Sequence, residues 1–99
     1  MKKIEFYTMV TRDEKPRAES VKGYTDGTFN YYRSADCATW HAVHPMVGLS
    51  VARGDTLHET VDAAYEPDRL KFINEEIDKR GAVLSANYAV AVAEAQEVH

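Results

Sequence analysis

The sequence predicts one α+β domain over residues 1–99, an antiparallel sheet of four to five strands with two to three C-terminal helices packed on one face. Residues 1–54 alternate apolar and polar side chains between turn signals, as short strands do. Residues 55–99 instead repeat apolar side chains every three to four positions, as amphipathic helices do. A length of 99 residues with 44% hydrophobic content suits a single core. Because consecutive strands usually lie side by side, we expect a meander.

The N-terminal segment 2–11 is rich in β-branched and aromatic residues, which favours a strand. Apolar side chains occur on both of its faces, so the pattern indicates an interior strand. The following run 12–19 is polar and contains Pro16, which predicts a loop.

Segment 20–33 has the pattern of a β-hairpin. Asp26-Gly27 is a favoured two-residue turn, because both residue types tolerate positive φ. This turn would place Tyr24 opposite Phe29, and Lys22 opposite Tyr31 on the same face.

Segment 38–54 has the pattern of a second hairpin, with Pro45 to Gly48 as its loop. The predicted register places His44 opposite Leu49. The same register places Ala42 opposite Val51 and Trp40 opposite Arg53.

After Gly54, Thr56 and Glu59 have the spacing of a capping box that begins a helix. Glu66 precedes Pro67, so this helix should end or kink there. Pro67 suits the first turn of a second helix, which would run to Arg80 and end at Gly81.

Residues 81–93 contain no charged side chain and fit either a helix or a strand. Their alanine content favours a helix. A helix with so little polar surface should be buried or form an interface, so a homodimer through residues 82–95 is one expectation.

Composition and the absence of targeting signals indicate where in the cell the protein is expected. The chain has a net charge of −4, a single cysteine and no apolar run long enough to span a membrane. Its first residues lack the apolar segment of a signal peptide. We therefore expect a cytoplasmic protein that does not bind membranes.

The charge is unevenly distributed, with eight Lys/Arg against six Asp/Glu in residues 1–54 and four against ten in residues 55–99. Acidic surfaces can bind a partner through electrostatic complementarity. The predicted protein-binding patch comprises Asp55, Glu59, Asp62, Glu66, Asp68, Glu75 and Glu76, with Asp78 beside it.

The alternative function is binding of single-stranded nucleic acid through the sheet, because aromatic rings among basic residues can stack on bases. This face would comprise Lys22, Tyr24, Phe29, Tyr31, Arg33, Trp40 and Arg53. If the helices cover the face, the same aromatic residues form the core, which is the interpretation that we favour.

Candidate catalytic and metal residues are few. Cys37, His41 and His44, with Asp36 beside them, are metal-ligand types. However, His41 and His44 are three residues apart on one strand, so they should point to opposite faces. We also find no signature of a cysteine nucleophile and no phosphate-binding glycine motif. The sequence therefore predicts a non-enzymatic protein without metal or cofactor.

The run from Trp40 to Thr56 resembles a segment of small uncharacterised phage and mobile-element proteins. In that segment a tryptophan-containing strand, a turn ending in Gly-Leu and a short strand precede a helix. The resemblance implies an accessory protein of a bacterial virus, such as a host-defence inhibitor of the anti-CRISPR kind. It implies no catalytic or ligand residue.

Overall fold

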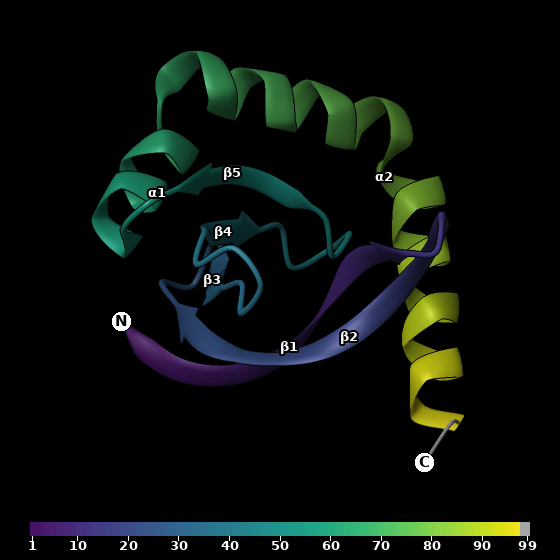
Figure 1. Cartoon of the computed structure of the whole chain (residues 1–99). Helices are drawn as coiled ribbons and strands as arrows, with labels where there is room; N and C mark the ends of the chain where they lie inside the picture. The colour runs from purple at the N-terminus through teal and green to yellow at the C-terminus, as the bar shows by residue number, and fades with distance from the viewer. Residues whose placement is uncertain (98–99) are drawn as a thin grey trace.

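A computed structural model describes residues 1–97, which form a five-stranded antiparallel sheet and two helices (Figure 1). The sheet is a meander, with its strands in the order of the chain. The α+β prediction is confirmed, with two helices rather than three. The elements are β1 (Lys2–Arg12), β2 (Lys15–Thr25), β3 (Asn30–Arg33), β4 (Trp40–Val43), β5 (Ser50–Gly54), α1 (Leu57–Ala64) and α2 (Pro67–Glu97).

The predicted loop at 12–19 is wrong, because β1 and β2 form one long hairpin that turns at Asp13 and Glu14. Both turn residues have positive φ, 52° and 65°, as a tight hairpin turn requires. Pro16 lies opposite Thr11, and it is tolerated because its nitrogen points away from β1. On that side of β2, β3 pairs only with Tyr24 and Thr25. β1 is an edge strand of the sheet, and not an interior one as its sequence indicated.

The β2–β3 hairpin forms as predicted, but its register differs by two residues. Tyr24 lies opposite Tyr31, because the turn extends from Asp26 to Phe29. The Asp26 carboxylate accepts hydrogen bonds from the backbone N–H groups of Thr28 and Phe29, at 2.9 and 2.8 Å. This side-chain turn replaces the expected two-residue turn. A shift of two residues leaves every side chain on its predicted face.

The β4–β5 hairpin has the predicted pairing next to its loop, where the His44 N–H donates to the Leu49 carbonyl at 3.0 Å. A β-bulge between Ala42 and Val43 then shifts the register by one residue. Ala42 therefore lies opposite Ala52, and the predicted partner Val51 is wrong. For the same reason, Trp40 lies opposite Gly54 and not opposite Arg53.

α1 begins at the predicted cap. The Thr56 hydroxyl accepts from the Glu59 N–H at 3.1 Å, and the Glu59 carboxylate accepts from the Asp55 N–H at 3.2 Å. The predicted capping interaction therefore forms. In a standard capping box the Glu59 carboxylate would accept from the N–H of Thr56, and here it accepts from the N–H of the preceding residue, Asp55.

α2 does not end at Gly81 as predicted, and residues 82–93 continue it as helix. Its first turn is capped by the Glu66 carboxylate, which accepts from the N–H groups of Asp68 and Arg69 at 3.2 and 2.9 Å. Gly81 is buried, and a Cβ placed there would lie 3.2 Å from Ile77 Cγ2. This glycine therefore serves close packing inside a helix that bends in its middle (Figure 1).

The first half of α2 packs over the β4–β5 side of the sheet, and its second half lies along β1 and β2 (Figure 1). The core between sheet and helices is formed by Phe29, Tyr31, Ala42, Ala52, Ala64 and Ile73. In residues 82–95 one face of the helix is half-buried, whereas Val83 and Val90 are 65% and 58% exposed. The half-buried residues include Leu84, Tyr88, Ala91, Val92 and Ala95.

β1 curves round to meet the β4–β5 loop. The Met9 N–H donates to the Gly48 carbonyl at 2.7 Å, and the Thr8 hydroxyl donates to the same oxygen at 3.2 Å. Beside them, the Tyr88 hydroxyl of α2 donates to the Tyr7 carbonyl at 2.5 Å. These three hydrogen bonds occupy the middle of the β1 edge and join it to both the loop and the helix.

Candidate functional site

The predicted acidic residues lie on the surface of the two helices. Asp55 and Glu59 lie at the start of α1, and Asp62 is paired with His58 at 3.3 Å. Two of the acidic residues stabilise the helices themselves, since Glu59 and Glu66 cap α1 and α2. The remaining three lie on α2, namely Asp68, Glu75 and the partly buried Glu76.

Phe72 is the residue at the centre of the α2 part of this patch, and it is 60% exposed. Asp68 precedes it by four residues, and Glu75 and Glu76 follow it by three and four. Residues at these spacings are neighbours on a helix surface, so three carboxylates, together with Arg69 three residues before Phe72, border one exposed aromatic ring. Phe72 is not among the residues that the sequence predicts for this patch, although the inward stripe of Leu70, Ile73 and Ile77 leaves it on the outer side of α2.

A groove of about 310 Å³ lies beside Phe72, between α2 and the β4–β5 hairpin. Its wall contains two arginines. Arg69 Nη1 donates to the Val51 carbonyl at 3.1 Å, and Arg80 Nε lies 3.8 Å from Glu76. Its apolar lining comprises Val47, Leu49, Val51, Phe72, Ile73, Ile77 and Leu84. The exposed ring therefore continues into an apolar surface.

The aromatic residues proposed for nucleic-acid binding lie largely in the core. Phe29 and Tyr31 are 2% and 0% exposed, so their rings have no open face on which a base could stack. Tyr24 and Trp40 are half-buried, with ring centroids 6.3 Å apart. The three basic residues of this set are exposed, namely Lys22, Arg33 and Arg53.

Asp26 connects this core to α1. Its Oδ2 accepts hydrogen bonds from the hydroxyls of Tyr31 and Tyr65, at 2.7 and 2.8 Å. Burial opposes ionisation of Asp26, but the hydrogen bonds from Phe29, Tyr31, Thr28 and Tyr65 outweigh it and lower the pKa of its carboxyl group. Burial, reinforced by the Asp26 charge, raises the pKa of Tyr31. This network is structural, because its acceptors are already occupied by the chain's own donors.

His41 and Ser50 bring an imidazole beside a hydroxyl, with Nδ1 and Oγ 3.1 Å apart. Ser50 Oγ also lies 3.4 Å from the Ala52 carbonyl, to which it donates. When the serine hydroxyl donates to Ala52, the His41 Nδ1–H donates to the serine, which is the reverse of the direction that activates a nucleophile. Burial and the nearby Arg53 lower the pKa of His41, and its ring stacks on Tyr32 at 5.1 Å. The His41–Ser50 contact therefore joins β4 to β5 beside the β-bulge.

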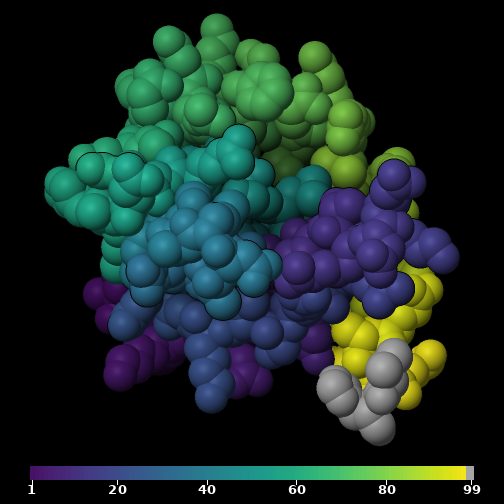
Figure 2. Space-filling view, in the orientation of Figure 1, coloured from purple at the N-terminus to yellow at the C-terminus, as the bar shows by residue number. Residues whose placement is uncertain are grey.

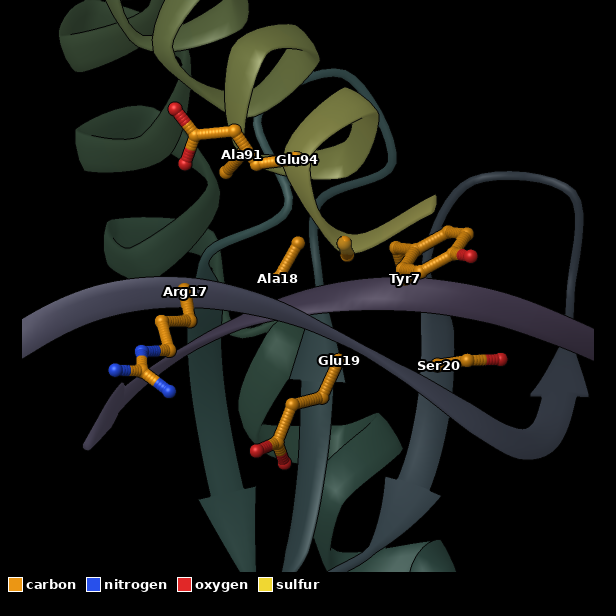
Figure 3. A pocket seen from close by; sticks show the side chains of 8 residues that line it. Tyr7, Arg17, Ala18, Glu19, Ser20, Ala91 and Glu94 are labelled. Atoms are coloured by element: carbon orange, nitrogen blue, oxygen red, sulfur yellow. The ribbon is translucent and has the colours of Figure 1, made fainter. Parts of the chain in front are cut away.

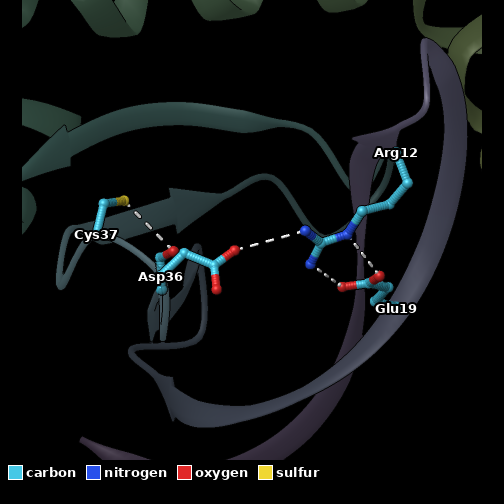
Figure 4. A network of polar contacts seen from close by, with 5 residues as sticks. Arg12, Glu19, Asp36 and Cys37 are labelled. Carbon is cyan, nitrogen blue, oxygen red and sulfur yellow. Dashed lines mark hydrogen bonds and ion pairs between the residues drawn. The ribbon is translucent and has the colours of Figure 1, made fainter.

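Cys37 and Asp36 lie in the loop between β3 and β4 (Figure 4). Arg12 reaches from β1 to this loop, with contacts of 3.0 Å to both Glu19 oxygens and 3.5 Å to Asp36. His44 points instead towards Phe29, at a centroid distance of 6.2 Å. Within residues 1–97, no group of three or more His, Cys, Asp or Glu side chains could hold a metal ion.

A larger hollow of about 700 Å³ lies between the β1–β2 hairpin and the second half of α2. Figure 3 shows Tyr7 and Ala18 pointing towards the helix, whereas Arg17 and Glu19 point to the other side of the hairpin. Glu94 is on the helix itself, so the charged groups do not converge on one point. The hollow thus presents Tyr7 and small side chains such as Ala18, and no set of reactive groups.

Comparisons of the chain with known protein families, curated proteins and solved structures found no match. No described helix combines the length and the apolar character needed to cross a membrane.

Proposed function

We propose that this chain is a non-catalytic protein-binding domain whose contact surface is centred on Phe72. One observation carries the proposal: a large aromatic side chain is 60% exposed among three carboxylates and beside an apolar groove. Exposed aromatic anchors with a polar surround are typical of the energetic centre of protein interfaces. The partner would offer an apolar pocket for the ring, bordered by Lys or Arg side chains.

The rest of the acidic patch adds long-range attraction to such a basic partner. Asp62 lies on α1, and Asp68 and Glu75 flank Phe72 on α2. Charges at the margin of an interface mainly raise the rate of association, and salt screens their effect. Binding should therefore weaken as ionic strength rises, while the Phe72 contact determines how long the complex lasts.

The biological setting that we propose is an accessory protein of a phage or mobile element, acting in the cytoplasm on a host protein. The resemblance of residues 40–56 to proteins of that class supports it. A host-defence inhibitor of the anti-CRISPR kind would use such a surface, since an acidic patch can occupy a basic nucleic-acid groove of its target.

The test is affinity capture from host extract with the wild type, Phe72→Ser and Val90→Ser, with mass spectrometry of the bound proteins. Val90 is a matched control, because it is an equally exposed apolar residue elsewhere on α2. We expect one protein that the wild type and Val90→Ser retain and Phe72→Ser loses. Equal capture by all three variants would contradict the proposal.

A second comparison tests the charges. Asp62→Lys with Glu75→Lys should reduce capture without unfolding the chain, whereas Glu66 is unsuitable because it caps α2. A labelled single-stranded oligonucleotide serves as the counter-test. If it binds in a salt-dependent manner that Arg33→Ala abolishes, the sheet and not Phe72 is the functional surface.

A further inference from the structure

The N-terminal half of β1 has an unpaired edge. In an antiparallel hairpin, alternate residues direct their N–H and C=O groups towards the partner strand and away from it. The Met9 N–H donates to Gly48 and the Tyr7 carbonyl accepts from Tyr88, so the odd-numbered residues of β1 point away from β2. The β1–β2 register contains no bulge, so Lys3 and Glu5 share this orientation.

This part of the edge has no strand paired with it within residues 1–97. β1 is the terminal strand of the sheet, and its hydrogen bonds to the β4–β5 loop and α2 are made at Tyr7, Thr8 and Met9. Lys3 and Glu5 are both exposed. In Figure 2 the purple atoms of the N-terminal residues reach the lower left margin of the molecule, while the yellow end of α2 lies at the lower right.

We propose that a second copy of this chain pairs with this edge, antiparallel, with Lys3 opposite Glu5 of the partner subunit. The two-fold axis would pass at Ile4, so the same pairing occurs twice. Both residues direct their backbone groups outwards, so each Lys3–Glu5 pair exchanges two backbone hydrogen bonds. The two five-stranded sheets would then form one continuous sheet.

Charge selects this register over its neighbours. A shift that centres the axis on Lys3 would place two lysines opposite each other, and a shift that centres it on Glu5 would place two carboxylates together. Within one chain, Glu5 already lies opposite Lys22 of β2. In the proposed pairing, Glu5 therefore lies between Lys22 of its own chain and the partner's Lys3. Exposed edges often carry lysine to prevent pairing, and here the facing glutamate cancels that effect.

The proposal is independent of the proposed function, because Phe72 lies on α2 and outside this interface. The first experiment is sedimentation equilibrium of the wild type, Lys3→Glu, Glu5→Lys and the double variant that exchanges the two charges. We expect a concentration-dependent dimer that either single variant weakens roughly tenfold or more, since each places like charges opposite each other twice. The double variant restores the opposite-charge pairs and should restore the dimer.

The second experiment measures amide hydrogen exchange at low and high protein concentration. The N–H groups of Lys3 and Glu5 should become protected as concentration rises, whereas those of Ile4 and Phe6, which face β2, should be protected at both. Val83→Glu with Val90→Glu tests the other dimer surface, residues 82–95, and should leave the dimer intact. A wild type that is monomeric at about 1 mM, a double variant that does not recover, or a dimer abolished only by the Val83 and Val90 changes would each overturn the proposal.

Discussion

Asp26→Ala is the substitution that most severely tests how the sheet is joined to α1. The carboxylate accepts four hydrogen bonds, two from its own turn and two from the hydroxyls of Tyr31 and Tyr65. Its carboxylate thereby links the β2–β3 turn, the core and the end of α1 through hydrogen bonds. Its removal should therefore destabilise the whole domain and not only the turn.

The magnitude follows from what each donor loses. Tyr31 is fully buried, so its hydroxyl would be left without a partner, which costs about 1–3 kcal/mol. The Thr28 and Phe29 N–H groups and the exposed Tyr65 hydroxyl can regain water, so each contributes about 0.5 kcal/mol. The expected loss in the free energy of unfolding is about 2.5–4.5 kcal/mol. For a domain of this size that lowers Tm by roughly 10–25 °C.

Chemical denaturation of the wild type, Asp26→Ala, Tyr31→Phe and the double variant measures the effect and its cause. Because Tyr31→Phe removes the orphaned hydroxyl, the double variant should be more stable than Asp26→Ala alone by about 1 kcal/mol or more. A loss below about 0.5 kcal/mol in Asp26→Ala, or no recovery in the double variant, would refute this reasoning.

The same carboxylate predicts a pH dependence. The hydrogen bonds lower the pKa of Asp26 in the folded state, so its contribution to stability is present above the ordinary aspartate value of about 3.9. It is lost as the pH falls from that value through the lowered folded pKa. The stability difference between the wild type and Asp26→Asn should therefore shrink in this acidic window, and a difference that stays constant would contradict the assignment.

Two further predictions concern backbone and cap. Gly48→Ala should destabilise the chain by more than about 2 kcal/mol, because Gly48 has a φ of 69° and a Cβ there would lie 2.2 Å from the Tyr88 ring. The control is Gly27→Ala, because Gly27 also has positive φ but a Cβ there would have no atom within 4 Å. Thermal unfolding should show a loss of about 1 kcal/mol for this control. Glu66→Ala should cost about 1 kcal/mol and reduce the helical circular-dichroism signal, because it removes the cap of α2, while Glu75→Ala on the same surface should change neither.

Much of the fold is predictable from local sequence patterns. Thr56 and Glu59 predict the start of α1, and the His44–Leu49 pairing follows from the Pro45 to Gly48 loop. The errors arise where tertiary contacts override local preference. Gly81 resembles a helix stop, but it lies inside α2 because Ile77 packs where a side chain would be.

Two other errors have backbone causes. The turn at Asp13 and Glu14 has no local sequence signal, because a glutamate rarely adopts positive φ, and Pro16 in a polar run is typical of a loop. The bulge beside Ala42 carries no sequence signal of its own, and it changes the pairing beyond it by one residue.

The candidate site was predicted only in part. The acidic residues are recognisable by composition, but their separate roles are not, since Glu59 and Glu66 cap helices while Asp68 and Glu75 surround Phe72. Phe72 itself has the same residue type as the core phenylalanines. Only its position outside the inward stripe, which the structure establishes, distinguishes an exposed anchor from a core residue.

The most direct test of the central claim is the dissociation constant of the captured partner for the wild type and for Phe72→Ala. An aromatic anchor at the centre of an interface is worth about 2 kcal/mol or more, which is roughly a 30-fold change in affinity. We predict a loss of at least that size for Phe72→Ala, and an affinity within about twofold of the wild type for Val90→Ala. Equal affinities for the wild type and Phe72→Ala would show that the partner binds elsewhere on the chain.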